Sequence, residues 1–168
     1  MAKQERQKQG QGKTEDVRRW VVWLLEGGGA HAKFEDVVAH FPAGLRGKKP
    51  DNLPYSAWQL LEHMRIAQAD ILDFSINPEY KEREWPAAYW PEAAAPGDEA
   101  AWTKSIRSFR ADLRRLQQLV ENPKTNLYAP IAWGDGQTIL REALLAADHN
   151  AYHLGQLVLV RRLLGAWK

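Results

Sequence analysis

The spacing of the apolar residues constrains the fold most strongly, because it follows a helical period along most of the chain. Four segments carry apolar residues three and four positions apart: 14–26, 54–74, 98–120 and 137–164. No segment alternates apolar and polar residues as a half-buried strand does. We therefore expect an all-α fold, a four-helix bundle with long crossover loops.

Local signals predict where these helices begin and end. Thr14 suits an N-cap, Pro54 suits a first helical turn, and Asp98 is expected to begin the third helix. Gly165 is expected to stop the fourth helix. A short helix is predicted at about 33–41.

The length of 168 residues suits one domain with a substantial core. Residues 1–13 are rich in Gln, Lys and Gly, and they are expected to form a polar N-terminal tail or a frayed helix start. Residues 14–168 are then expected to form the single folded domain.

Composition narrows the classes of function. The absence of cysteine excludes disulfides and thiolate metal sites, and it is compatible with a reducing cytoplasm. A net charge of +2 gives no argument for nucleic acid. No stretch approaches the roughly 20 apolar residues of a membrane span, and the polar start is unlike a secretory signal. We expect a cytoplasmic protein without a membrane or nucleic-acid partner.

Two histidines stand four residues apart within the apolar segment 137–164. His149 and His153 would project about 40° apart, with Cα atoms about 6 Å apart along the helix axis. Two imidazoles so placed can meet at one metal ion, with metal–nitrogen distances of about 2.0–2.1 Å. His63 stands at the edge of the apolar face of 54–74 and could supply a third ligand.

Three neutral imidazoles with one open coordination position are typical of catalytic zinc. The competing interpretation is that each histidine is a hydrogen-bonded core residue, and the spacing alone does not decide between the two. His31 and His40 adjoin glycines and a loop, so we expect both on the surface.

Other polar residues share or flank the histidine stripe. Gln156 is interpreted as a hydrogen-bond partner of a ligand or of a substrate, with a satisfied core glutamine as the alternative. Glu142 lies about 10 Å along the axis from His149, too far to bind the same ion. We expect a solvated end-of-helix carboxylate, with a residue that orients a ligand or a substrate near one end of the bundle as the alternative. Tyr152 either donates a hydrogen bond near the ion or packs at the core boundary.

The segment 75–97 has too many prolines for regular structure and carries Trp85, Tyr89 and Trp90. Long loops in compact domains are often functional or mobile. This one either roofs a pocket or plugs one end of the bundle, and we expect the plug.

Two long segments resemble signature segments of the DinB-like (DinB/YfiT) superfamily, a group of damage-inducible metalloproteins. They are LPYSAWQLLEHMRIAQADIL (53–72) and WGDGQTILREALLAADHNAYHLGQLVLVRRLLG (133–165). The stretches GLRGKKPDNLP (44–54) and EWPAAYWPEAAAP (84–96) resemble one bacterial branch, so the resemblance extends from about Thr14 onward.

The resemblance implies a bundle of down-up-up-down type and a divalent ion, zinc or nickel. It implies His63 as the ligand of the second helix and His149 with His153 as the HxxxH pair of the fourth. It further implies a homodimer and a transferase reaction between a low-molecular-weight thiol and a small electrophile. The alternatives are a metal-dependent hydrolase and a non-enzymatic, dimeric metal-binding stress-response protein, because many members have no known reaction.

Overall fold

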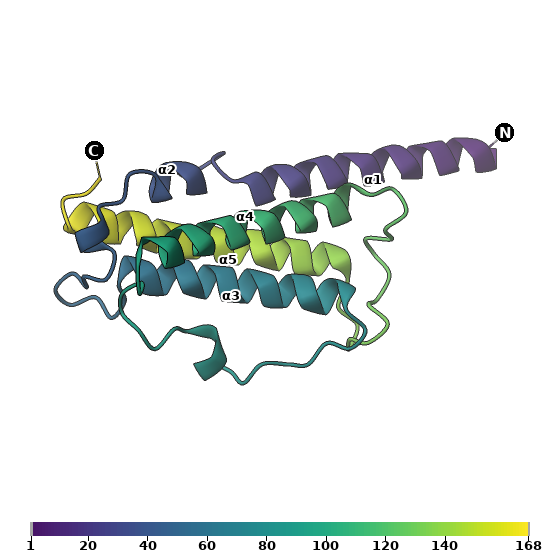
Figure 1. The fold of residues 1–168 in the computed structure, drawn as a ribbon. Coiled ribbons are helices and arrows are strands. Elements are labelled where there is room, and N and C mark those ends of the chain that lie inside the picture. The colour runs from purple at the N-terminus through teal and green to yellow at the C-terminus, as the bar shows by residue number, and fades with distance from the viewer. Residues whose placement is uncertain (1, 168) are drawn as a thin grey trace.

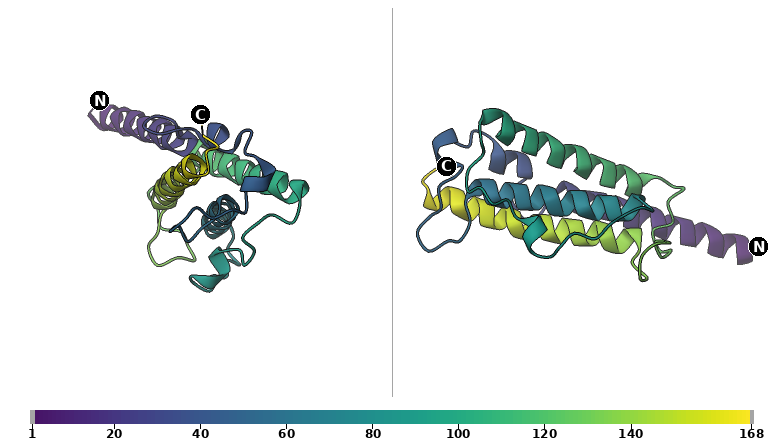
Figure 2. Two further views of the ribbon diagram at one scale, coloured as in Figure 1. Left: turned by 90° about the vertical axis from the view of Figure 1, so that its left-hand side faces the viewer. Right: turned by 60° about the horizontal axis from the view of Figure 1, so that its bottom comes forward.

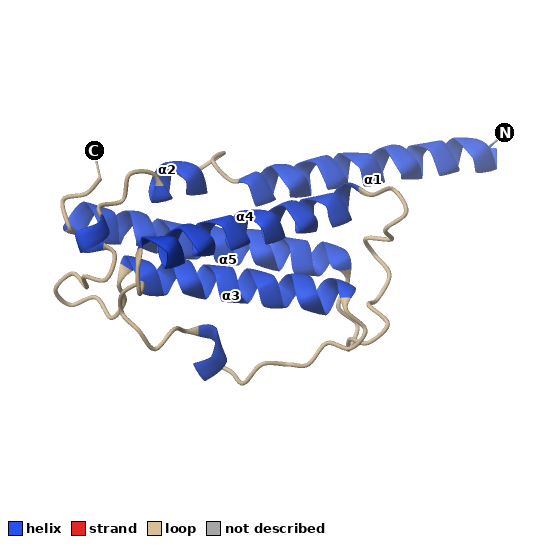
Figure 3. Ribbon diagram, in the orientation of Figure 1, coloured by secondary structure: helices blue, strands red, loops and turns tan. Residues whose placement is uncertain are grey.

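The computed structural model describes residues 2–167, with side chains from residue 12 onward, and the described chain is all-helical (Figure 3). Its long helices are α1 (Ala2–Glu26), α3 (Ala57–Ile76), α4 (Glu99–Glu121) and α5 (Ile139–Leu163). The connections contain the short helix α2 (Phe34–Val38) and two 3₁₀ turns, η1 (Ala43–Leu45) and η2 (Ala87–Tyr89). Within residues 2–167 there is no strand, only an isolated bridge between Pro130 and Thr138. The predicted all-α class is confirmed.

The four long helices lie side by side (Figure 1). Helix α3 packs against α4 and α5, and α1 packs against the same two helices from the other side. Helices α1 and α5 run in one direction, whereas α3 and α4 run in the opposite one (Figure 1). The N-terminal part of α1 projects past the ends of the other helices (Figures 1 and 2).

Two of the predicted helix starts are wrong. Helix α1 already begins at Ala2, so Thr14 lies inside it and is not its N-cap. Helix α3 begins at Ala57, and Pro54 lies ahead of its first turn. The reason is a capping box: the Ser56 side chain accepts from the Gln59 amide at 3.2 Å, and the Gln59 side chain accepts from the Ser56 amide.

The predicted start of α4 at Asp98 and the predicted stop of α5 at Gly165 are confirmed. Helix α2 is shorter than the predicted 33–41, and α5 begins at Ile139 rather than at residue 137. The Asp98 carboxylate caps α4 by accepting from the Ala101 amide at 2.6 Å. Helix α5 ends in a Schellman motif, in which Gly165 has a φ of +68° and donates to the Arg162 carbonyl at 3.0 Å. Ala166 donates to the Arg161 carbonyl at 2.8 Å, so the last carbonyls are satisfied.

The apolar core is divided into two clusters along the helices. One contains Trp58, Phe109 and Leu157, and the other contains Leu72 and Leu116. Both clusters contain residues of α3 and α5, and these two helices also carry the buried polar side chains of His63, Gln68, His153 and Glu142. The core therefore fixes the relative position of the two helices that carry the histidines.

The segment 77–97 connects α3 to α4, which run in the same direction. It must therefore return over the length of α3, about 30 Å for a helix of this size. It does so along the outside of α3, where η2 lies against that helix (Figures 1 and 2). Tyr80, Glu82 and Tyr89 of this segment line a cavity together with residues of α3 and α5. None of the helices in the described chain is long and apolar enough to cross a membrane.

Candidate metal centre

The three predicted histidines converge at one point between α3 and α5. The Nε2 atom of His63 lies 3.1 Å from Nε2 of His149 and 3.1 Å from Nε2 of His153. One nitrogen of each residue lies within 4.8 Å of the other two. Two ligands of one tetrahedral zinc ion stand about 3.3 Å apart, so this cluster can hold a metal ion.

A backbone carbonyl sets the protonation of His63, which is almost fully buried. Its Nδ1 lies 3.0 Å from the main-chain oxygen of Tyr89. A carbonyl oxygen can only accept, so Nδ1 of His63 carries the proton and donates it. Its Nε2 is then an unprotonated nitrogen whose lone pair points at the other two rings.

A side-chain amide fixes the position of the proton on His153. Its Nδ1 lies 2.8 Å from Oε1 of Gln156, one helical turn away. The Gln156 oxygen accepts from Nδ1, which leaves Nε2 of His153 free to bind a cation. Gln156 thus lies beside His153 as a hydrogen-bond partner, as its place on the stripe predicts.

The fixed tautomers of His63 and His153 place two lone pairs face to face. His63 and His153 bring two unprotonated nitrogens to 3.1 Å from each other, although neither has a proton to share. Facing lone pairs repel each other, and a cation placed between them removes the repulsion. The donor set therefore matches a metal ion better than it matches three ordinary core histidines.

Burial keeps all three imidazoles neutral. Loss of hydration lowers the pKa of His149 to about 4, and the nearby His153 and His63 rings add to the effect. Burial also lowers the pKa of His63 and of His153, although their hydrogen bonds to Tyr89 and Gln156 oppose the change. Neutral imidazole is the form that binds metal ions.

Tyr152 and Glu142 differ in their relation to the centre. The Tyr152 ring meets the edge of His153 with centroids 4.9 Å apart, but the residue is largely exposed. It therefore lies at the outer boundary of the centre. The prediction of a solvated Glu142 is wrong: the residue is only 2% exposed, and its carboxylate pairs with Arg141 at 2.7 Å. Glu142 lines a cavity together with Asp70, Tyr80 and Tyr89, so residues from other parts of the chain surround it.

The aromatic loop lies on the centre and does not plug an end, so that prediction is also wrong. The Trp90 ring stacks on His63, with centroids 3.8 Å apart and planes 3° apart. Tyr55 stacks on the other side of Trp90 at 4.3 Å. The reason is the return path along α3, which brings Tyr89 and Trp90 level with His63. Trp85, by contrast, is mostly exposed.

A buried carboxylate on α3 was not among the predicted site residues. Asp70 accepts from the Tyr89 hydroxyl at 2.6 Å and from the Tyr80 hydroxyl at 3.2 Å, and it pairs with Arg83 at 3.3 Å. Burial and the Asp70 charge raise the pKa of Tyr80 to about 12 and also raise the pKa of Tyr89. Both tyrosines therefore remain protonated donors. The sequence did contain a signal for Asp70. It lies seven residues after His63, and residues seven apart share one face of a helix.

A hydrogen-bonded amide pair between α3 and α5, Gln68 and Asn150, was also missed. Gln68 is fully buried, donates to the Phe109 carbonyl at 2.7 Å, and accepts from the Asn150 amide at 2.8 Å. It links α3, α4 and α5 at the residue that follows His149. A glutamine within an apolar helical run was the only sequence signal.

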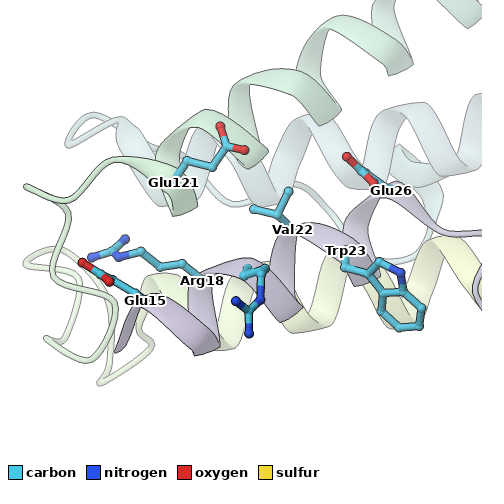
Figure 4. A pocket seen from close by; sticks show the side chains of 7 residues that line it. Glu15, Arg18, Val22, Trp23, Glu26 and Glu121 are labelled. Carbon is cyan, nitrogen blue, oxygen red and sulfur yellow. The ribbon is translucent and has the colours of Figure 1, made fainter. Parts of the chain in front are cut away.

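The histidines outside the cluster, His31 and His40, are exposed, as predicted. Another cavity lies between α1 and the end of α4, and it is lined by Glu15, Arg18, Val22, Trp23 and Glu121 among others (Figure 4). Arg18 donates there to the Thr125 carbonyl at 2.5 Å and to the Val120 carbonyl. Those bonds secure the end of α4, and no histidine lines this cavity.

Comparison of the chain with protein-family models, with curated proteins and with solved structures finds no match. The chemistry of the centre is therefore argued from its own geometry.

Proposed function

We propose that this chain is a divalent-metal-dependent enzyme in which His63, His149 and His153 bind zinc or nickel. The observation that carries the proposal is the pair of unprotonated Nε2 atoms of His63 and His153, held 3.1 Å apart by the bonds of their Nδ1 atoms to Tyr89 and Gln156. We also propose the DinB-like, down-up-up-down bundle, which the directions of the four long helices support (Figure 1).

The favoured reaction is transfer to a low-molecular-weight thiol. A divalent ion at this centre supplies a Lewis acid that lowers the pKa of a thiol or of a water molecule. Because His63, His149 and His153 are neutral, they would leave the double charge of a bound ion uncompensated, and the centre would then favour an anionic thiolate over a neutral ligand. In the transfer, the sulfur–carbon bond forms and the leaving group departs with its electron pair. The thiol proton passes to solvent.

The surrounding residues hold and shield the centre. Tyr89 and Gln156 orient two imidazoles, and Trp90 covers the face of His63. Exclusion of water on that side strengthens electrostatic interactions within the groove. We assign no general base.

The test begins with metal binding. Wild-type protein loaded with Zn²⁺ or Ni²⁺ and dialysed is expected to retain about one ion per chain, measured by elemental analysis. His63→Ala and His153→Ala should each lose it, because two imidazoles remain, whereas exposed His31→Ala should retain it. Unchanged metal content in both triad variants would overturn the proposal.

Turnover then separates the alternatives. We expect the loaded protein to consume small alkyl or aryl electrophiles with glutathione, mycothiol or bacillithiol. Hydrolysis of activated esters or amides without thiol would favour the hydrolase. Retained metal with neither reaction would favour a non-enzymatic metal-binding protein. We also propose a homodimer, which sedimentation of the purified protein tests.

A further inference from the structure

The exposed apolar side chains are concentrated on α1 and α5, which pack against each other. Over its whole described length α4 exposes no large apolar side chain, whereas α1 exposes three and α5 exposes five. Among them are Trp23 and Leu24 of α1 and Leu144, Leu159 and Leu163 of α5. Apolar surface gathered in one region of a protein marks an interaction site.

On α5 these side chains surround a glycine. Five residues project within about 40° of Gly155 around the helix axis. They are Leu144, Asp148, Ala151, Leu159 and Arg162, and together with Gly155 they are named here the α5 face. A cavity between α1 and α5 adjoins this face, since Leu144, Asp148 and Ala151 line it together with Trp23 and Leu24.

Gly155 has no packing role within its own chain. It lies in the middle of α5, where glycine costs helix stability relative to alanine. It is exposed, and a Cβ atom at this position would meet no atom within 4 Å outside its own stretch of helix. A second helix against the α5 face gives the glycine a reason, because helix axes approach most closely where small side chains meet.

The α5 face is complementary to itself in charge. Asp148 and Arg162 are both exposed, and neither forms a salt bridge within the described residues. They lie seven residues before and seven residues after Gly155. Their Cα atoms are therefore about 21 Å apart along α5, too far to pair within one chain.

A two-fold axis at Gly155 brings these charges together. If two α5 helices cross there in opposite directions, Asp148 lies beside Arg162 of the partner subunit. Ala151 then lies level with Leu159 of the partner subunit, so that a small side chain stands opposite a large one. A surface that is complementary to itself about a two-fold axis is what an isologous dimer requires.

We propose that a second copy of this chain docks on the α5 face, with the two α5 helices antiparallel and crossing at Gly155. The interface rests on the homodimer proposed above but not on the metal-dependent function. His149 and His153 project about 120° and 160° away from Gly155 around α5, toward His63 of α3. The metal centre and the interface therefore occupy different sides of the same helix.

Bulk at Gly155 tests the close approach. Wild-type protein at tens of micromolar should sediment as a dimer. Gly155→Leu should weaken association by at least about tenfold, because two leucine side chains would meet on the axis. Leucine is the better helix former, so the variant should keep its fold. Ala111→Leu, at an exposed position within α4, is the matched control and should sediment as wild type does.

Exchange of the charges tests the orientation of the helices. Asp148→Arg and Arg162→Asp should each weaken the dimer several-fold, because each brings like charges together across the axis. The double variant should recover association, since both pairs re-form with their charges exchanged. Asp148 and Arg162 cannot pair within one chain, so an effect on the fold of the monomer would not produce this recovery.

Two results would overturn the interface. One is a wild-type chain that stays monomeric at tens of micromolar, which would leave the α5 face to another partner. The other is a dimer that is unchanged in Gly155→Leu and in both single charge variants, because association would then use another surface.

The same samples distinguish this interface from the metal-dependent function. Sedimentation is repeated in chelator, and the metal content of each variant is measured by elemental analysis. A dimer that is sensitive to Gly155→Leu but retains no metal would support the interface while the metal function fails. A monomer that retains its ion would support the metal centre and overturn the interface.

Discussion

His63 donates its Nδ1 proton to the main-chain oxygen of Tyr89 at 3.0 Å, although 26 residues separate the two. This bond joins a buried helical side chain to the loop that covers it. An ion bound by Nε2 of His63 would therefore share its imidazole with the hydrogen bond that attaches the loop to α3. Order in the loop and occupancy of the centre should be coupled.

Hydrogen exchange tests that coupling. On metal loading, the amides of Ala88, Tyr89 and Trp90 are expected to exchange about tenfold more slowly, because the bound state favours the closed loop. His63→Ala should abolish the effect. The amide of Leu116, inside α4, serves as the internal reference and should not respond. Equal slowing at Leu116 would indicate global stabilisation and would contradict a specific link.

Removal of the Gln156 side chain should weaken metal binding. Its oxygen fixes the His153 tautomer at 2.8 Å, and such supporting groups are worth about 10- to 100-fold in affinity. We expect Gln156→Ala to lose at least about tenfold in a competition titration against a chelator. Gln156→Glu should equal or exceed wild type, because a carboxylate accepts more strongly. Exposed Gln118→Ala is the control, and equal losses in both alanine variants would contradict the assignment.

The parts of the centre that lie on helices were predictable, because helical geometry relates spacing to direction. The HxxxH spacing of His149 and His153, together with the face of His63, was sufficient to propose the cluster. The expected position of Gln156 followed from the same stripe. The direction of each side chain needs only the rotation and rise of a helix, whereas the meeting of two helices at the histidines was an expectation from the bundle fold.

The loop contributions could not be predicted in this way. Tyr89 supports His63 with its backbone carbonyl, a group that every residue has, so no side-chain signal marks it. The burial of Glu142 comes from tertiary packing, which its place in the first turn of α5 does not reveal. The prediction that α3 begins at Pro54 was wrong for a different reason. Ser56 and Gln59 form a capping box, which starts the helix at Ala57.

Metal-free protein should lose stability on acidification through the range set by the histidines. An unfolded histidine titrates near pH 6.5, whereas burial lowers the pKa of His149 to about 4. Between these values the unfolded chain binds more protons than the folded one, so the free energy of unfolding falls as the pH falls from about 6.5 to about 4. His63 and His153 act in the same direction.

Denaturant titrations in chelator across this range measure the effect. His149→Gln should show a weaker pH dependence than wild type, while His31→Ala should match wild type. A wild-type free energy of unfolding that rises on acidification would contradict neutral, buried imidazoles.

Arg161 should stabilise the fold without contributing to the metal centre. It is 7% exposed and donates to the carbonyls of Val37 at 2.6 Å, Ala39 at 2.9 Å and Ala166 at 2.8 Å, which ties α2 to the end of α5. Arg161→Met keeps much of the volume but removes the donor of a buried carbonyl, Val37, and of two partly buried ones, Ala39 and Ala166. We expect a loss of about 3 kcal/mol in the free energy of unfolding, because several acceptors lose their donor.

The neighbouring Arg162→Met is the matched control, since Arg162 is exposed, and it should stay within about 0.5 kcal/mol of wild type. Arg161 lies eight residues beyond His153, about 12 Å along α5. Arg161→Met should therefore keep wild-type metal affinity below its unfolding transition. A weaker metal affinity in the folded variant would show that the hydrogen bonds of Arg161 at the end of α5 also position the histidines.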